Sequence, residues 1–378
     1  MKKLELNIEQ FEKWTNAFGP SGFESEVAKM VKDYVSQFAD EVTNDKTGSL
    51  IFKKGTKGPK IMLAGHIDEI GFIVAGITKD GFITFNQLGG WWDQTLLSQK
   101  VIIRNRDNEK FTGVIVAKPP HILSKDERGK VVKKENMFID IGCKNKKEVE
   151  ALNIKIGDPI MPDSYFKLLK RTQIRKKNNN DKEEEKEVTL AMGKAFDDRA
   201  GAFVMAEVLR RLQEENIEHP NQIYGVATVQ EEVGLRGART AAQLIKPDVG
   251  FALDVDISGD IPGVSKTKTP SEMSKGPALL TADSSMLPNP KLKHFVMDIA
   301  EETGVDFQLS ILARGGTDAG VIHLTGIGCP SLAINISTRH IHSHNSILDI
   351  NDIQQTVDLL VEIVKRLDKK TVESFTAI

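Results

Sequence analysis

Carboxylate and imidazole side chains gather in five short segments, each of which lies at the end of a predicted strand or the start of a predicted helix. The segments are 65–69, 196–199, 230–232, 254–256 and 339–344. Any one of them has an ordinary explanation, such as a helix cap or a surface pair. Because ligands bind at the carboxyl ends of the strands in an open α/β sheet, the five together predict a single site.

The chemistry of such a site follows from its donor types. Mixed imidazole and carboxylate ligands suit divalent ions such as Zn²⁺, Co²⁺ or Mn²⁺. Two ions ~3.5–4 Å apart need a bridging carboxylate, and a water between them needs a general base that is not itself a ligand. The adjacent Glu231 and Glu232 can divide that work. The pair His66 and Asp68 also fits, since a ligating imidazole usually gives its other N–H to a second group.

An α/β scaffold is predicted to position these segments. Strands and helices alternate after residue 188, and a shorter run of the same kind occupies the N-terminus. This alternation predicts a mixed sheet sandwiched by helices. The expected strands are 50–53, 61–64, 223–228, 249–255, 307–312 and 331–336. The expected helices are 7–18, 25–38, 199–215, 235–245, 291–303 and 351–368.

The region between the two α/β parts has a different character. It consists of short β-branched segments separated by Gly, Asn and Asp, which predicts a small all-β module. We therefore expect one catalytic α/β domain, 1–72 and 188–378, interrupted by an inserted β domain at 73–187. The charged run 170–187 is expected to be a solvated hairpin tip or loop. Trp91-Trp92 looks exposed and could stack on sugars, although packing or an assembly contact is the favoured interpretation.

Composition excludes several classes of protein. The 378 residues include 51 Lys+Arg and 53 Asp+Glu, and the resulting net charge of -2 argues against a nucleic-acid-binding protein. No apolar run reaches the roughly 18–20 residues that cross a membrane. The N-terminus lacks the apolar core of a signal peptide, and two cysteines make no disulfide framework. We expect a cytoplasmic protein with no membrane or nucleic-acid partner.

Six motifs occur together in a characteristic order: GHIDEIG, AFDDRAG, VQEEVGLRGA, ALDVD, GGTDAG and RHIHS. In order and spacing the chain resembles the co-catalytic metallo-aminopeptidases that form tetrahedral particles. These are the TET, glutamyl and deblocking aminopeptidases of metallopeptidase family 42, some members of which are labelled endoglucanases. The resemblance implies a di-metal exopeptidase-like catalytic domain with an inserted PDZ-like β domain. It also implies peptide substrates and self-association into a large homo-oligomer, a dodecamer.

The resemblance also implies a ligand set for two divalent ions per chain, Zn or Co with Mn as a further possibility. The implied metal ligands are His66, Asp197, Glu232, Asp254 and His342. Asp197 corresponds to the bridging ligand, and the peptide bond after it is expected to be cis. His66 and Asp254 would complete the first site, while Glu232 and His342 would complete the second. Here Asp-Asp replaces the Asp-Asn that is common in the family.

Two further roles are implied by the same resemblance. Glu231 corresponds to the general base, and Asp68 to the carboxylate that orients His66. The spacing of His340, His342 and His344 would place all three on one face of an extended strand, so the choice of His342 comes from the family pattern. The loop containing Gly315-Gly316-Thr317-Asp318 is expected beside the substrate in the family, although a plain turn explains it equally well.

Three functions compete at this point. The leading hypothesis is an aminopeptidase in which Glu231 takes the proton of a metal-activated water. A glycoside hydrolase normally needs two carboxylates flanking a sugar and no metal, so histidines at two strand ends argue against it. A catalytically inactive scaffold on the same fold is disfavoured by the complete ligand set and Glu231.

Overall fold

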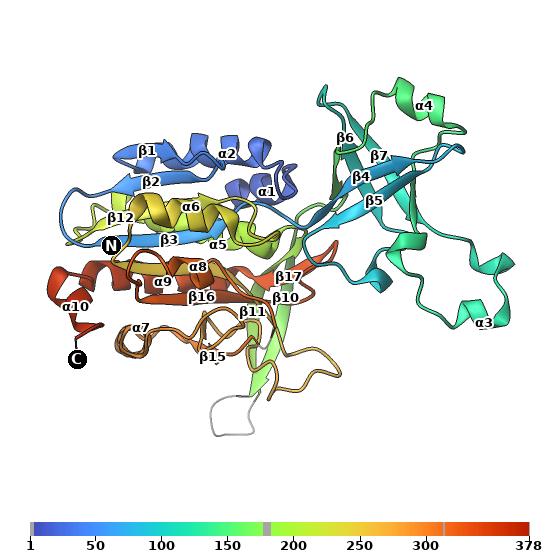
Figure 1. Ribbon diagram of the computed structural model, residues 1–378. Coiled ribbons are helices and arrows are strands. Elements are labelled where there is room, and N and C mark those ends of the chain that lie inside the picture. The colour runs from blue at the N-terminus through green and yellow to red at the C-terminus, as the bar shows by residue number, and fades with distance from the viewer. Residues whose placement is uncertain (1–3, 177–182, 313, 378) are drawn as a thin grey trace.

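A mixed eight-stranded sheet forms the centre of the larger part of the molecule (Figure 1). The computed structural model describes residues 4–176, 183–312 and 314–377. In spatial order the strands are β1 (Glu41–Asn44), β2 (Leu50–Lys54), β12 (Gln222–Thr228), β3 (Lys60–His66), β13 (Val249–Ile257), β16 (Ser331–Thr338), β14 (Ala278–Leu280) and β15 (Gln308–Ser310). The four middle strands β12, β3, β13 and β16 are parallel, so their carboxyl ends share one edge.

Helices cover both faces of this sheet because its strands are apolar on both sides. In β3, Ile61 and Leu63 pack on one cluster, whereas Met62 and Ala64 pack on another. The first cluster contains residues of α1 (Ile8–Asn16), α2 (Ser25–Val35), α5 (Phe196–Glu214), α7 (Pro290–Thr303) and α9 (Ile350–Arg366). The second contains residues of α6 (Arg236–Ile245) and α8 (Ala319–Ile322), and α10 (Lys369–Ser374) ends the chain. The expected mixed α/β fold is confirmed.

A closed six-stranded barrel stands beside the sheet (Figure 1). Its strands are β4 (Gly71–Ile77), β5 (Ile83–Leu88), β6 (Lys100–Arg104), β7 (Lys110–Val116), β8 (Phe138–Asp140) and β9 (Pro159–Pro162). It has its own hydrophobic core, and its helices α3 (Lys125–Arg128) and α4 (Lys146–Ala151) are short. The expected all-β character is present, but a PDZ-like fold is not confirmed. Single 3₁₀ turns occur at Ser36–Phe38, Asp93–Thr95, Pro120–Ile122 and Lys134–Asn136.

Most of the charged run lies in a hairpin and not in a loop. β10 (Lys167–Lys176) pairs with β11 (Glu183–Gly193), and residues 177–182 at its tip lie outside the described residues. The end of β11 pairs in turn with β17 (Ser346–Asp349), which directly precedes α9. Through β11, the hairpin is therefore hydrogen-bonded to the C-terminal part of the chain. The domain boundary at 187 stays a prediction.

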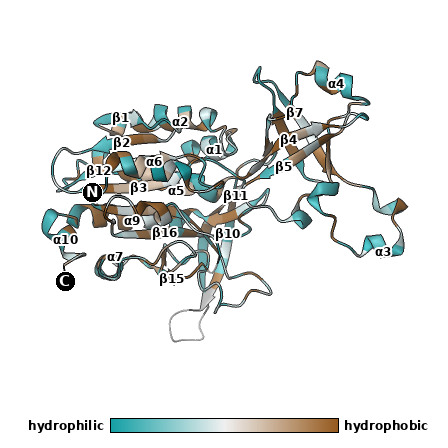
Figure 2. Ribbon diagram, viewed as in Figure 1, coloured by the Kyte–Doolittle hydropathy of each residue, from teal (hydrophilic) through white to brown (hydrophobic). Residues whose placement is uncertain are grey.

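Hydropathy follows this layering. The strands of the central sheet are largely hydrophobic, whereas α2 and α4 carry hydrophilic surfaces (Figure 2). Within the described part of the chain, no helix has the length and apolar character needed to cross a membrane.

Candidate active site

The carboxyl edge of the parallel strands brings the predicted residues together around Asp197. This residue lies in the first turn of α5, and its two carboxylate oxygens face different imidazoles. Oδ1 lies 3.2 Å from Nε2 of His66, at the end of β3. Oδ2 lies 3.2 Å from Nε2 of His342, which follows β16. The peptide bond between Asp197 and Asp198 is cis, as expected.

Two groups of potential metal ligands share this carboxylate. The first is His66, Asp197 and Asp254, and the second is Asp197, Glu232 and His342. Within each group the ligand atoms lie within 4.8 Å of one another. Nε2 of His66 and Oε1 of Glu232 are buried and have no hydrogen-bond partner among the described residues. Buried acceptor atoms that converge without a donor fit a cation, so these residues suit a pair of divalent ions.

Both imidazoles are oriented through their other nitrogen. Nδ1 of His66 lies 3.1 Å from the backbone carbonyl of Asp68, and Nδ1 of His342 lies 2.8 Å from that of Gly90. A carbonyl oxygen only accepts, so each Nδ1 carries a hydrogen and each Nε2 faces Asp197, where a neutral ring could offer its lone pair to an ion. This is the arrangement usual for metal-ligating histidines. The partner of His66 lies two residues along the chain, whereas the partner of His342 belongs to the barrel.

The carboxylate of Asp68 organises the glutamate loop. Its Oδ1 lies 3.5 Å from Nδ1 of His66, farther than the residue's own carbonyl oxygen. Oδ1 of Asp68 accepts the backbone N–H of Glu231 at 3.0 Å, and Oδ2 accepts that of Glu232 at 3.2 Å. Ser21 donates its hydroxyl to the same carboxylate at 2.6 Å. Asp68 therefore fixes the backbone that carries both glutamates, in addition to any influence on His66.

Glu231 stands apart from both ligand groups. Its Oε2 lies 3.6 Å from Nε2 of His66, yet it is in neither group of potential ligands. Burial, together with the nearby Asp254, raises the pKa of Glu231 well above the usual value. A carboxylate with a raised pKa beside a group of potential metal ligands is suited to accepting and returning a proton.

Carboxylates outnumber imidazoles in this buried cluster, and the pKa values of its members are shifted by burial and by the neighbouring charges. Burial and repulsion from Asp197 raise the pKa of Glu232 to about 8. Although burial opposes it, contact with His342 and His66 holds the pKa of Asp197 well below its usual range. Burial would lower the pKa of His342, but Glu232 and Asp197 raise it to about 10. The cluster thus favours added positive charge, which either protons or divalent cations can provide.

Several supporting residues were missed by sequence reasoning. Asp198 accepts the backbone N–H of His66 at 3.0 Å through Oδ2 and that of Gly201 at 2.8 Å through Oδ1. A buried network joins Glu69 to Lys194 at 2.8 Å and to Arg199 at 3.0 Å. The DDRAG motif contains two of these residues, but it does not show that an arginine near the start of a helix is fully buried.

The three histidines after β16 point to different places. The strand ends at Thr338, and His340 and His342 have left-handed φ angles of 61° and 55°. The expectation that an extended backbone would place them on one face is therefore wrong. His340 is exposed, whereas His344 is buried with its ring 5.2 Å from that of Trp91. The expectation that the tryptophan pair is exposed is wrong for Trp91, which is 8% exposed, and confirmed for Trp92, which is 62% exposed.

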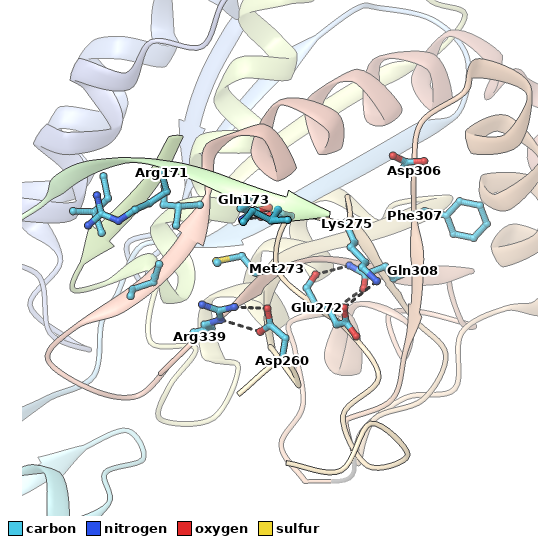
Figure 3. Close-up of a pocket in the computed structure, with 15 residues that line it drawn as sticks. Arg171, Gln173, Asp260, Glu272, Met273, Lys275, Asp306, Phe307, Gln308 and Arg339 are labelled. Carbon is cyan, nitrogen blue, oxygen red and sulfur yellow. Dashed lines mark hydrogen bonds and ion pairs between the residues drawn. The ribbon is translucent and has the colours of Figure 1, made fainter. Parts of the chain in front are cut away.

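A cavity of about 670 Å³ opens above the ligand cluster. Its walls include Leu312 and the segment Gly315-Gly316-Thr317, so the glycine-rich loop does lie beside the cluster. A second hollow of about 1120 Å³ lies along β10 (Figure 3). Arg339 there binds Asp260, with Nε 2.9 Å from Oδ1. Neither ligand group of the described residues belongs to this second hollow, so the first cavity is the candidate active site.

Comparison with known proteins identifies the family. The model of the M42 glutamyl aminopeptidases matches residues 48–359. The chain belongs to this family. It is 34% identical over 98% of both chains to the putative aminopeptidase FrvX of Escherichia coli. It is 33% identical to the lysyl aminopeptidase of Pyrococcus furiosus, over 93% of this chain and 95% of that protein. The M42 chain is accordingly a peptide hydrolase of the aminopeptidase type.

Several solved structures share the fold over almost the whole chain. A TET aminopeptidase from a marine sediment archaeon, Thaumarchaeota archaeon SCGC AB-539-E09, has a TM-score of 0.91 and 49% identity over 98% of both chains. The TET1 peptidase of Pyrococcus horikoshii, which can assemble into a tetrahedron or a large octahedral shell, has a TM-score of 0.79 and 28% identity over 95% of this chain and 99% of that one. A Thermotoga maritima protein named as an endoglucanase has a TM-score of 0.73 and 27% identity over 97% and 99%.

Proposed function

We propose that the chain removes N-terminal residues from peptides with the help of two divalent ions, Zn²⁺ or Co²⁺ with Mn²⁺ as a further candidate. The shared carboxylate carries this proposal. Asp197 directs one oxygen toward each imidazole, so a single residue can belong to both ligand groups. His66 and Asp254 would hold one ion, and Glu232 and His342 the other. Two divalent cations in this position would supply the Lewis acidity that activates water and polarises the scissile carbonyl.

Glu231 is proposed as the general base. Its carboxylate takes a proton from the attacking water, whose oxygen forms the new bond to the scissile carbon. When the carbon–nitrogen bond breaks, Glu231 returns the proton to the leaving amine nitrogen. Asp68 supports this cycle by accepting the backbone N–H of Glu231 at 3.0 Å, which holds the base in place. The carboxylates around the cavity also offer partners for the positively charged N-terminus of a peptide.

Glu231→Gln tests the division of labour between the two glutamates. The variant should retain two ions per chain and nearly all thermal stability, because Glu231 belongs to neither ligand group. Turnover should fall by about 10²–10⁴-fold, the usual contribution of a general base. Metal analysis and hydrolysis of aminoacyl chromogenic substrates, with Glu→Gln at the exposed Glu218 as the matched control, measure both quantities. A parallel loss of metal and activity would contradict the proposal.

The glycoside hydrolase alternative is tested with the same preparations. The endoglucanase name of one structural neighbour is the observation that keeps it open. Wild-type protein loaded with Co²⁺ or Zn²⁺ should cleave aminoacyl substrates and lose this activity on chelation. A soluble β-glucan should release no reducing ends in the same assay. Metal-independent glucan cleavage that survives Glu231→Gln would favour the alternative, while loaded protein with neither activity would favour the inactive scaffold.

A further inference from the structure

A backbone segment of the barrel contacts residues of the second ligand group. Residues 89–91, here called the Gly-Gly-Trp loop, begin the connection from β5 to β6. The carbonyl of Gly90 accepts a hydrogen bond from Nδ1 of His342 at 2.8 Å, across 252 positions in the sequence. This bond sets the tautomer and the ring orientation that present Nε2 to Asp197. The corresponding nitrogen of His66 is bonded instead to the carbonyl of Asp68.

Both glycines lie too close to the second ligand group to carry a side chain. A Cβ on Gly90 would stand 2.9 Å from Nδ1 of His342. A Cβ on Gly89 would stand 2.9 Å from Oε2 of Glu232 and 2.5 Å from Cγ2 of Ile70. Gly89 also has a left-handed φ of 78°, which glycine adopts without strain. The loop therefore needs two glycines because its backbone touches both of these ligands.

Trp91 anchors the loop at the point where the barrel joins the sheet. Its indole Nε1 donates to the carbonyl of Gly71 at 3.1 Å, and Gly71 is the first residue of β4. Its ring stacks on Phe72, with the centroids 4.8 Å apart and the planes 22° apart. The ring of His344 also lies close to it, with the centroids 5.2 Å apart. The buried tryptophan thus connects the loop to both β4 and the histidine segment.

We propose that the Gly-Gly-Trp loop positions His342, so that the barrel sets the affinity of the second metal site. Gly90 acts through its carbonyl, and Trp91 is a positioning residue that acts through Gly90. The inference rests on the proposed two-metal function. It assigns to the inserted barrel a role inside the catalytic centre, separate from any role in assembly.

Metal titration of two variants tests the inference without relying on activity. Gly90→Ala would push a Cβ against the imidazole, and Trp91→Ala would release the loop from Gly71 and Phe72. In each, the second ion should bind about 10–100-fold more weakly, the usual effect of losing the outer partner of a metal-ligating histidine. The first ion should bind as in the wild type. Calorimetric titration of the apoprotein with Zn²⁺, together with metal analysis, measures both sites.

Matched controls separate this effect from general damage. Gly129→Ala places a Cβ in open space on the same barrel, and Trp92→Ala removes the neighbouring tryptophan, which is 62% exposed. Both should keep two ions at wild-type affinity. Circular dichroism reports whether Trp91→Ala folds, and Gly90→Ala remains decisive if it does not. Two tightly bound ions in Gly90→Ala would overturn the inference alone, whereas a wild type that binds fewer than two would overturn the proposed function as well.

Discussion

At the scale of single side chains, the site depends on which nitrogen of each imidazole is free. In both His66 and His342 a backbone carbonyl occupies Nδ1 and leaves Nε2 facing Asp197. Fixing a ring in this way lowers the entropy lost when an ion binds, and it excludes the tautomer that cannot ligate. The two rings differ in how secure that bond is, since His66 is buried while His342 is partly exposed. We therefore expect the second site to be the weaker of the two.

Alanine substitution of the three neighbouring histidines distinguishes the proposed metal ligand from the two histidines that are not expected to bind metal. His342→Ala should reduce the metal content toward one ion per chain and abolish most activity, because it removes a direct ligand of the second site. The loss should exceed the roughly 10–100-fold that is typical of removing an outer partner. His340→Ala is the matched control, since that ring is exposed and lies in neither ligand group.

His344→Ala has a different expected outcome. The ring is buried against Trp91, and burial lowers the pKa of His344 to about 4, so it is neutral at physiological pH. The variant should keep two ions while losing some thermal stability. Metal analysis of the three purified proteins decides the question. Loss of one ion in His344→Ala but not in His342→Ala would show that the ligand lies two residues farther along the chain.

At the scale of elements, the sequence indicated where strands and helices meet the site. Apolar runs such as 61–64 and 249–255 located the buried parallel strands, and the polar residues after them converge as predicted. Contacts between distant segments could not be predicted in this way. The bond from His342 to Gly90 and the burial of Arg199 depend on how the barrel and the N-terminal segment pack, and neither leaves a periodic pattern.

Short elements were also missed for a physical reason. β1, β14 and β17 have four, three and four residues, too few to show a clear alternation of polar and apolar side chains. The expected strand 307–312 is shorter in the structure, where β15 covers Gln308–Ser310. The charged run 170–187 is expected to be a solvated hairpin tip or loop, and a hairpin is present, but most of the run lies in its strands β10 and β11. Antiparallel pairing of these two strands supplies an order that the composition of the run does not reveal.

The turn between β1 and β2 depends on one carboxylate. Oδ1 of Asp45 accepts the backbone N–H groups of Thr47, Gly48 and Ser49 at 2.8–2.9 Å. Its Oδ2 accepts the hydroxyl of Thr240 on α6 at 2.5 Å. Although burial opposes the effect, these hydrogen bonds lower the pKa of Asp45 below its usual value. The charged form is thus favoured by folding.

Asp45→Asn should therefore lower the free energy of unfolding by about 1–3 kcal/mol at pH 7. A carboxyl group with a lowered folded-state pKa stabilises fully above its unfolded-state pKa of about 3.9, and this contribution is lost as the pH falls through the folded-state value. The difference between wild type and variant should shrink below about pH 4. Urea unfolding across this range measures it, with Asp33→Asn on the exposed face of α2 as the control. An equal effect of both substitutions, or one independent of pH, would contradict the assignment.

At the scale of the whole molecule, the barrel is expected to drive self-association into a large particle, with a dodecamer as the expected form. The TET1 peptidase, to which this chain is similar, assembles into a tetrahedron or an octahedral shell. The barrel also presents large apolar side chains to solvent, among them Trp92 at 62% and Ile122 at 64% exposure. A hollow particle would admit peptides to the cavity above Asp197 and exclude folded proteins. Coupled to the Gly-Gly-Trp loop, the same barrel would then serve both assembly and catalysis.

Light scattering of the purified protein should show a mass many times that of the 41.9 kDa chain. Ile122→Asp places a charge among the exposed apolar groups of the barrel and should shift the mass toward smaller species. Ile327→Asp, at a more exposed isoleucine of the α/β part, is the control and should leave the particle intact. Burying an unpaired carboxylate in an interface costs several kcal/mol, enough to change the distribution of species at micromolar concentration. A wild-type protein that is monomeric and fully active at that concentration would refute the role of the barrel in assembly, whereas dissociation by Ile327→Asp alone would move the interface to the α/β part.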